Sequence, residues 1–425
     1  FLLNKDADGL VADEKRWHPY KGCCTDVFFD WGIDFVDRNK DKPFFLYIAT
    51  NVPHGPFNVD KKYSDAYEAK GVAGTMAKFY GMIENFDENM GRLMAKLDEL
   101  KLADNTILIF TTDNGTAAGI ARGRGGDNAG WKGFNDGMRG QKGSEYDGGH
   151  RVPFFIRWPE RIKAGRDLPL LTAHIDVLPT LASLCSVELP KPLQQKTYLD
   201  GRSLRPLIFP QEGSGADHWP SRTITVHSQR IETPEKWRKS AVMTNRWRLV
   251  NGKELYDMNA DSGQAQDVAA DHPDIVKLLT AEYETWWQHI DDRFDEYVRI
   301  PLGATEANPT TFTCHDWHAN NVPWNHGMIS RMPKASGFWA VDVKQAGKYE
   351  VTLRLRPEGT EFPLQKGMAK VTVGDVEKSA AITPGASEAV VTLNLPAGPA
   401  KLQTWLDEEG RGTRGAYFVT VERVE

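Results

Sequence analysis

The stretch Thr106-Ile107-Leu108-Ile109-Phe110-Thr111-Thr112 decides the fold class, and it runs directly into Asp113-Asn114-Gly115. A short continuous apolar run that is rich in β-branched residues is typical of a strand buried on both faces. Strands of this kind occur in parallel sheets whose two faces are covered by helices. The stretch therefore predicts an α/β fold.

The sequence on either side of this strand supports the same fold class. Two more short apolar runs, at 44–48 and 152–156, predict further buried strands. Apolar residues recur every three or four positions over 27–36 and 76–100, which predicts two helices. Strands and helices in this order predict a mostly parallel sheet flanked by helices.

The pattern changes twice along the chain and predicts three domains. Residues 1–215 form the α/β core, which we expect to be incomplete at its N-terminal side. Residues 216–300 combine short strand-like runs with one helical pattern, which predicts a small α+β lobe. Between 304 and 425 the helical period is absent, and short strands separated by Gly and Pro turns predict an appended β-sandwich. We place a linker at 301–309.

The composition is that of an ordinary globular protein and excludes several classes of partner. The 425 residues are 40% hydrophobic and carry a net charge of −6. This acidic balance gives no overall attraction for nucleic acid or for an anionic membrane surface. No stretch approaches the roughly 18 apolar residues that span a bilayer. We therefore predict neither nucleic acid nor a membrane as a partner, and any anion-binding site must be local.

Two of the predicted strands lead into polar side chains that could carry chemistry. In open α/β sheets, ligands bind beyond the carboxyl ends of the strands. The run 44–48 leads to His54, and the run 106–112 leads to Asp113 and Asn114. Paired hard oxygen ligands suit Ca²⁺ or Mg²⁺ better than Zn²⁺. Each stretch could also be an ordinary turn, and two ligands do not complete a Ca²⁺ shell of about six to eight oxygens.

A glycine-rich stretch forms a third candidate. Residues 119–143 contain nine glycines, and Arg139 and Lys142 are among the five basic residues that outnumber two acidic ones. A flexible, solvated loop would explain the glycines. Alternatively, a glycine-rich backbone can approach an anionic substrate closely, with Lys142 as a point charge for it.

Three stretches of the sequence, in this order, resemble the motifs of one enzyme family. They are Pro53-His54-Gly55-Pro56, Thr112-Asp113-Asn114-Gly115 and the run 142–153, which reads Lys-Gly-Ser-Glu-Tyr-Asp-Gly-Gly-His-Arg-Val-Pro. Weaker similarity continues at 174–180, 200–204 and 254–257. The chain thereby resembles the formylglycine-dependent sulfatases, arylsulfatase-like members of the alkaline phosphatase superfamily.

The resemblance implies roles for individual residues. Asp113 and Asn114 would be two ligands of Ca²⁺, with Mg²⁺ as the alternative ion. His54 and Lys142 would contact the sulfate of a sulfated carbohydrate or a small sulfate ester, and His54 is the candidate to protonate the departing alkoxide. Arg139 is a further candidate for substrate binding. A location in the periplasm or outside the cell is also implied.

One family feature is not found in these 425 residues. The family's nucleophile is a formylglycine made from the Cys or Ser of Cys/Ser-x-Pro-x-Arg, and the sequence contains no such motif. We therefore expect the nucleophile in an N-terminal segment that would precede Phe1, and we expect this chain alone to be inactive. The sequence also shows no signal peptide.

Two other functions remain open from the sequence. One is a phosphate or phosphonate ester hydrolase of the same superfamily, which shares the layout of metal and nucleophile. The other is a non-catalytic protein that has kept the basic cleft and the β-domain and binds glycans.

Overall fold

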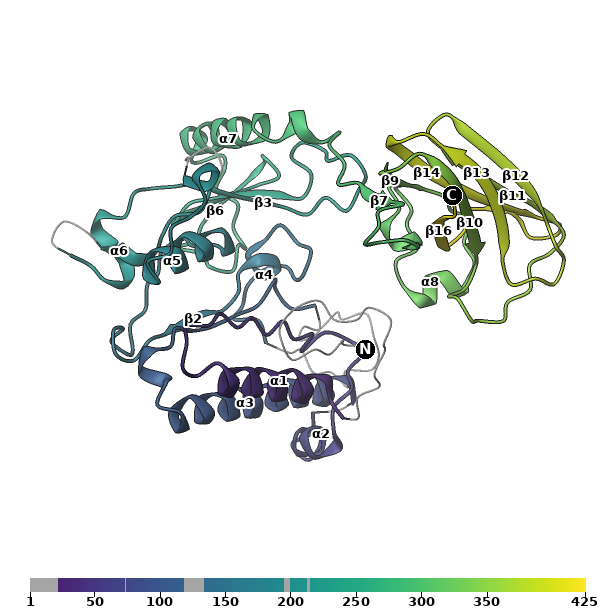
Figure 1. Cartoon of the computed structure of the whole chain (residues 1–425). Coiled ribbons are helices and arrows are strands. Elements are labelled where there is room, and N and C mark those ends of the chain that lie inside the picture. Colours follow the sequence, from purple (N-terminus) through teal and green to yellow (C-terminus); the bar gives the residue numbers. More distant parts are fainter. Residues whose placement is uncertain (1–21, 73, 118–133, 195–198, 212–214) are drawn as a thin grey trace. The chain divides into compact units, whose positions relative to one another are not determined.

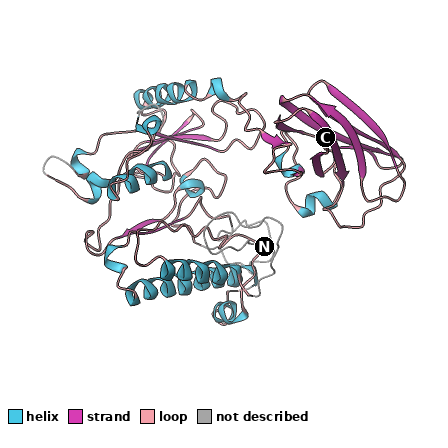
Figure 2. Cartoon of the chain, in the orientation of Figure 1, coloured by secondary structure: helices cyan, strands magenta, loops and turns pink. Residues whose placement is uncertain are grey.

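The computed structural model describes residues 22–72, 74–117, 134–194, 199–211 and 215–425. The chain forms two compact units: one contains the residues up to Ser228 together with Trp237–Trp286, and the other contains Gln229–Lys236 and Trp287–Glu425. Figures 1 and 2 show a mixture of helices and short strands in the first unit and mainly strands in the second.

Two long helices pack side by side in the first unit. α1 (Cys24–Arg38) and α3 (Gly74–Glu99) confirm the predictions at 27–36 and 76–100. Their shared core contains the buried side chains Phe29, Val36, Leu93 and Leu97. A short helix that was not predicted, α2 (Lys61–Glu68), begins where the side chain of Asp60 accepts a hydrogen bond from the backbone N of Lys62. None of the described helices is both long and apolar enough to cross a lipid bilayer.

The predicted strands at 106–112 and 152–156 form a sheet of two strands among the described residues. β1 (Leu108–Thr111) and β2 (Phe154–Arg157) pair antiparallel, with Phe110 opposite Phe155. The prediction that these strands are parallel to each other is therefore wrong. An apolar run indicates that both faces of a strand are covered, but it carries no information about the direction of the neighbouring strand.

Helices pack on both faces of this sheet, as the fold class predicts, although Phe155 is 65% exposed. On one face Phe110 contacts Phe86 of α3, with ring centroids 5.6 Å apart. On the other, Phe154 and Ile156 join a core with α5 (Val177–Leu184) and α6 (Arg205–Ile208). Figure 1 shows α1 and α3 on one side of β2 and α5 on the other.

The run 44–48 is extended but is not part of a described strand. Phe44, Leu46 and Ile48 pack on the core of α1 and α3, whereas Phe45 and Tyr47 are 75% and 79% exposed. The prediction of a strand buried on both faces is wrong here. Successive side chains of an extended segment point to opposite sides, so five apolar residues in a row fit one packed face as well as two.

The described part of the lobe contains an antiparallel sheet with its four strands in sequence order. These strands are β3 (Ile224–His227), β4 (Ser240–Met243), β5 (Trp247–Val250) and β6 (Glu254–Asp257). The one helical pattern predicted within 216–300 forms α7 (Pro273–Gln288), in which Leu279 and Tyr283 are buried. Most of the lobe, up to Ser228 and over Trp237–Trp286, lies in the same compact unit as the helices and strands before it, whereas Gln229–Lys236 and the residues from Trp287 onward belong to the second unit.

The second unit consists of two sheets around one hydrophobic core. One sheet has the order β13-β10-β16-β8, and the other has the order β12-β11-β14-β9-β7 with β15 paired to β14. The elements are β7 (Ile300–Leu302), β8 (Thr310–Thr313), α8 (His326–Ser330), β9 (Phe338–Val343), β10 (Gly347–Arg354), β11 (Gly367–Val373), β12 (Val376–Ile382), β13 (Ala389–Leu395), β14 (Gly398–Glu408), β15 (Gly412–Arg414) and β16 (Phe418–Arg423). Alternate side chains of both sheets are buried in this core, where Trp339 is fully inaccessible.

The predicted linker at 301–309 needs a correction. β7 overlaps it and pairs parallel with β9, and the side chain of Leu302 is fully buried. These residues belong to a sheet because their side chains fill the core of the second unit. The domain boundaries predicted at 215 and 304 stay predictions.

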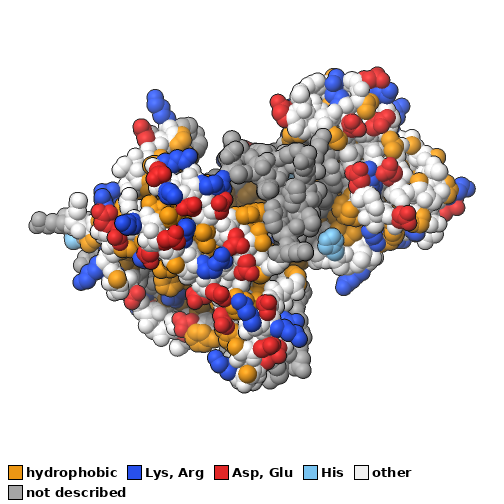
Figure 3. Space-filling model, turned by 60° about the horizontal axis from the view of Figure 1, so that its bottom comes forward, with side chains coloured by type: hydrophobic (Ala, Val, Ile, Leu, Met, Phe, Trp, Pro, Cys, Tyr) orange, Lys and Arg blue, Asp and Glu red, His pale blue; other side chains and the backbone are white. Residues whose placement is uncertain are grey.

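Charged side chains of both signs are interspersed on the face of the molecule that Figure 3 shows. Asp34 and Arg38, for example, form an ion pair on the exposed side of α1. Such pairs keep the local potential low, because each positive group lies beside a negative one.

Candidate functional site

The two predicted metal ligands lie just beyond the end of β1. Asp113 is exposed, Asn114 is half-buried, and the side-chain Nδ2 of Asn114 donates to Oδ2 of Asp113. The two side chains therefore meet at one point. Rotating the Asn114 amide by about 180° would place its oxygen there instead, and the two residues would then offer hard oxygen ligands to a single cation.

Backbone hydrogen bonds bring Lys142 to this strand end. The backbone N of Lys142 donates to the carbonyl O of Thr116, which is two residues after Asn114, over 3.0 Å. One more bond holds the same segments together, from the N of Gly115 to the O of Gly149, also over 3.0 Å. The two separate stretches of sequence that carry Asp113, Asn114 and Lys142 are thus joined through their backbones.

Glycines make this close approach possible. A Cβ atom on Gly115 would lie 2.0 Å from the carbonyl O of Gly148, and a Cβ on Gly149 would lie 2.1 Å from the O of Ser144. A Cβ on Gly148 would lie 2.4 Å from the O of Gly140. We call Gly115, Gly140, Gly148 and Gly149 the glycine cluster. These separations are far shorter than any van der Waals contact. A side chain at Gly115, Gly148 or Gly149 would therefore force the backbones apart.

Part of the glycine-rich stretch 119–143 lies outside the described residues, namely 119–133. The described part near Lys142 is bound on both sides by backbone hydrogen bonds, so it is not a freely solvated loop. Sequence analysis assigned no role to Gly148 and Gly149. The two adjacent glycines are visible in the run 142–153. Their close approach to Gly115 could not be predicted, because Gly115 is distant in sequence.

His54 lies in a separate turn. Its Nδ1 donates to the carbonyl O of Gly55 over 2.6 Å, which leaves Nε2 available for proton exchange. The backbone N of His54 bonds to the O of Asn51, and the side chain of Asn51 accepts from Sγ of Cys24 at the start of α1. The described contacts do not join His54 to the other predicted site residues, so its place in the site stays a prediction.

Arg139 is held by protein groups. Its Nη1 donates to the hydroxyl of Tyr256 over 2.8 Å and to the carbonyl O of Gln264 over 3.0 Å. Its Nη2 donates to the hydroxyl of Tyr146 over 2.9 Å, and the guanidinium lies 3.9 Å from the centre of that ring. These contacts anchor Arg139 on the lobe, and its role in substrate binding stays a prediction.

His174 is a neighbour of the site to which sequence analysis assigned no role. It begins the 3₁₀ helix His174–Asp176, and its Nε2 donates to the carbonyl O of Thr112 over 2.8 Å. It therefore contacts the residue immediately before Asp113.

Behind the site lies a buried ion pair. α4 (Asp147–His150) begins at Asp147, whose Oδ1 accepts from Nε of Arg248 over 2.9 Å. The two side chains are 1% and 9% exposed. Asp147 thus joins the run 142–153 to β5 of the lobe, and breaking such a pair leaves an uncompensated buried charge.

Burial also affects His150 at the end of α4, and this predicts a pH dependence. Burial lowers the pKa of His150 below its ordinary value of 6.5, although Asp147 opposes the shift. The folded protein keeps the imidazole neutral where the unfolded chain takes up a proton, so the free energy of unfolding should fall as the pH drops below 6.5. Urea unfolding of the wild type and of His150→Gln at pH 8, 6.5 and 5 tests this. The variant should lose less stability on acidification, and equal losses would contradict the assignment.

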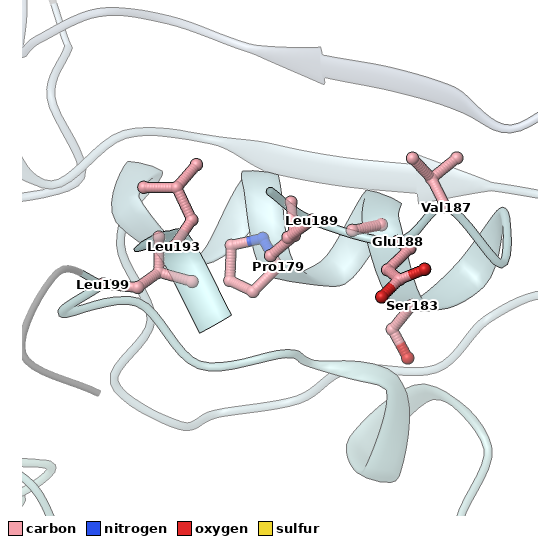
Figure 4. A pocket seen from close by; sticks show the side chains of 8 residues that line it. Pro179, Ser183, Val187, Glu188, Leu189, Leu193 and Leu199 are labelled. Carbon is pink, nitrogen blue, oxygen red and sulfur yellow. The ribbon is translucent and has the colours of Figure 1, made fainter. Parts of the chain in front are cut away.

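A cavity of about 520 Å³ lies beside α5, but it does not contain the predicted site (Figure 4). Its lining is mostly apolar and consists of Pro179, Ala182, Ser183, Val187, Glu188, Leu189, Leu193 and Leu199.

In the part of the chain that the structure describes, no three His, Cys, Asp or Glu side chains gather as metal ligands. Asp113 and Asn114 therefore fit a hard cation as two of its ligands, and the described residues do not complete the shell.

Comparison with known protein families now identifies the class of protein. Residues 4–187 match the family model described as Sulfatase, and residues 141–288 match the model described as N-sulphoglucosamine sulphohydrolase, C-terminal. The two matches overlap over residues 141–187, which include Lys142, Gly148 and Gly149. The chain belongs to the sulfatase family.

Individual relatives agree with this assignment. The chain is 28% identical over 282 residues to the N-acetylgalactosamine-6-O-sulfatase of Bacteroides thetaiotaomicron, which covers 61% of this chain and 50% of that protein. It is 36% identical over 176 residues to the steryl-sulfatase of Mus musculus, which covers 41% of this chain and 26% of that protein. The chain thus spans half of the length of the first relative and about a quarter of the second.

Two solved structures share the fold. Ps i-CgsB, crystallised in complex with k-i-k-neocarrahexaose, has a TM-score of 0.55 and 23% identity, over 67% of this chain and 58% of that one. The putative sulfatase yidJ from Bacteroides fragilis has a TM-score of 0.50 and 20% identity, over 68% of this chain and 63% of that one. These similarities confirm the predicted fold class.

Proposed function

We propose that this protein hydrolyses sulfate esters of a sulfated carbohydrate, with Asp113 and Asn114 holding a Ca²⁺ ion and Lys142 contacting the sulfate. The observation that supports this proposal most directly is the pair of backbone hydrogen bonds that join the Lys142 loop to the end of β1. They hold the backbone of Lys142 close to the segment that carries Asp113 and Asn114, and we propose that the lysine side chain and the two oxygen ligands act on the same group. That combination suits an anionic tetrahedral group.

The proposed chemistry assigns one task to each group. Sulfate-ester cleavage places negative charge on the sulfonyl oxygens and on the departing alcohol oxygen. Lys142 would stabilise the first, together with the positive charge that Ca²⁺ or Mg²⁺ supplies when bound. His54, whose Nε2 is available, would donate a proton to the second. The nucleophile implied by the family resemblance is a formylglycine.

The choice of a carbohydrate follows from the extent of similarity. Of the two relatives reported above, the N-acetylgalactosamine-6-O-sulfatase matches over 282 residues and the steryl-sulfatase over 176. The longer match extends the resemblance over 61% of the chain, compared with 41% for the steryl-sulfatase. We also propose a periplasmic or extracellular location, which fractionation of the native cells would test.

Replacing Lys142 tests the proposed function. In the full-length protein purified from its native source, we expect turnover of N-acetylgalactosamine 6-sulfate that EDTA abolishes. Lys142→Ala should lower kcat/KM by about 10²-fold, because a preorganised charge beside the developing oxyanion is lost. Lys78→Ala, a change at an exposed position of α3, is the matched control and should have no effect.

Matched sulfate and phosphate esters separate the alternatives. Preference for the phosphate ester would replace the proposal with a phosphate or phosphonate ester hydrolase. Glycan binding by the full-length protein without hydrolysis of either ester would favour a non-catalytic glycan-binding protein. Turnover that does not change in Lys142→Ala would refute the role assigned to this lysine.

A further inference from the structure

The loop 139–147, which carries Lys142, is bound at both ends by one residue of the lobe. Gln264 is fully buried, and its φ of 53° is a conformation that residues other than glycine rarely adopt. Its carbonyl O accepts from Nη1 of Arg139 over 3.0 Å, and its side-chain Oε1 accepts from the backbone N of Asp147 over 2.8 Å. Residues other than glycine keep such a backbone conformation only where the surrounding structure holds them in it. Here the surrounding structure includes the loop 139–147, to which Gln264 is bound by these two hydrogen bonds.

Four side chains form a closed hydrogen-bond network beside Gln264. Arg139 donates to the hydroxyls of Tyr146 and Tyr256, and both hydroxyls donate to Oε2 of Glu254, that of Tyr146 over 2.8 Å. Two of these residues belong to the loop and two belong to β6. Both hydroxyls donate and accept within this network, and the positive charge of Arg139 is balanced by the negative charge of Glu254.

The protonation states agree with this network. Burial, followed by the hydrogen bond to Glu254, raises the pKa of Tyr146 to about 12. The same causes raise the pKa of Tyr256. Both hydroxyls therefore keep their protons at neutral pH and can act as donors to the carboxylate.

The loop is also bound to the end of β1. The backbone N of Lys142 bonds to Thr116, and the backbone N of Gly148 donates to the O of Arg139 over 2.8 Å, which closes the loop at its base. Lys142 thus lies in the middle of a loop whose ends are held by the lobe and whose centre is held by the strand end. The position of the Lys142 backbone therefore depends both on the lobe and on the end of β1.

We infer that Gln264, Glu254 and Tyr256 of the lobe are positioning residues for Lys142. This inference rests on the proposed function of Lys142. A lysine ammonium is a compact charge on a flexible stem, so its place beside Asp113 and Asn114 depends on how firmly its backbone is held. Displacement of a catalytic group by about 1 Å can cost 10²-fold in rate. The lobe therefore acts on the chemistry through the loop, without touching the substrate.

Hydrogen exchange tests the inference without any assay of activity. Tyr256→Phe removes one hydroxyl from the network and keeps the ring. We expect backbone amides over 139–149 to exchange at least tenfold faster in this variant of the full-length protein. Tyr349→Phe is the matched control, because it removes the hydroxyl of another buried tyrosine, which bonds to the O of Gln345 in the second unit. Unchanged exchange over 139–149 in Tyr256→Phe would overturn the inference.

A double-mutant cycle tests whether the effect acts through Lys142. Tyr256→Phe should lower kcat/KM for the sulfate ester about tenfold in the wild type and less than twofold in the Lys142→Ala background. A purely structural loss would lower both equally, and that result would overturn the positioning role. Absence of any sulfate-ester turnover in the wild type would instead refute the proposed function, while the exchange experiment would still decide whether the lobe holds the loop.

Discussion

Asp176→Asn is expected to lower the free energy of unfolding by about 3–5 kcal/mol, the usual cost of breaking a buried ion pair. Asp176 is fully buried, and its two oxygens accept from Nη1 and Nη2 of Arg222 over 2.9 and 2.7 Å. They also accept from the backbone N of Arg202 and Ala173 over 2.8 and 2.9 Å. An amide would direct N–H groups at some of these donors and would leave the charge of Arg222 without a partner.

The exposed pair of Asp34 and Arg38 is the matched control for this substitution. Its atoms are 3.0 Å apart, but the side chains are 63% and 40% exposed. Asp34→Asn should therefore cost less than about 1 kcal/mol. Urea unfolding of the two variants and the wild type provides the comparison, and equal costs for the two substitutions would contradict the importance of burial. Asp176 also ends the 3₁₀ helix of His174, so its loss should loosen the contact of His174 with Thr112.

Gly115→Ala is expected to lower sulfate-ester kcat/KM of the full-length protein by more than 10²-fold and to cost about 3 kcal/mol of stability. The new Cβ would lie 2.0 Å from the O of Gly148, 2.9 Å from its carbonyl C and 3.1 Å from the carbonyl C of Gly149. All three atoms belong to the backbone, so no side chain can rotate to make room. The strand end with Asp113 and the loop with Lys142 must move apart.

Gly91→Ala in α3 is the control for the Gly115 substitution. A Cβ at Gly91 meets nothing within 4 Å, and alanine in a helix should stabilise the protein by up to about 1 kcal/mol. Unfolding curves and sulfate-ester kinetics should be measured on both variants. Normal stability and turnover in Gly115→Ala would show that the backbones of the site do not need to be this close.

Local patterns in the sequence predicted much of the fold. The periodicity of apolar residues placed α1, α3 and α7 to within a few residues, because a helix repeats its contacts every three or four positions. The motifs at 53–56, 112–115 and 142–153 indicated the family, which the comparisons confirm. β4 and α2 were not predicted.

The site was predicted in part. Asp113, Asn114 and Lys142 follow from strand ends, charge and the family motifs, and the structure brings the segments that carry them together. The glycine cluster, the anchoring of Arg139 and the position of Gln264 could not be predicted. Arg139 and Gln264 are 125 positions apart, and no pattern within a helix or a strand reports a contact over that distance.

By itself, the sequence determined which segments are helical or extended, which strand ends carry oxygen and nitrogen ligands, and which family the motifs resemble. These properties depend on neighbours a few residues away. Only the tertiary structure decided that β1 and β2 run antiparallel, that one side of 44–48 is open, and that the lobe holds the Lys142 loop. Strand direction, coverage of a face and loop anchoring all depend on which distant segments pack together, and that choice is made by the burial of the whole core.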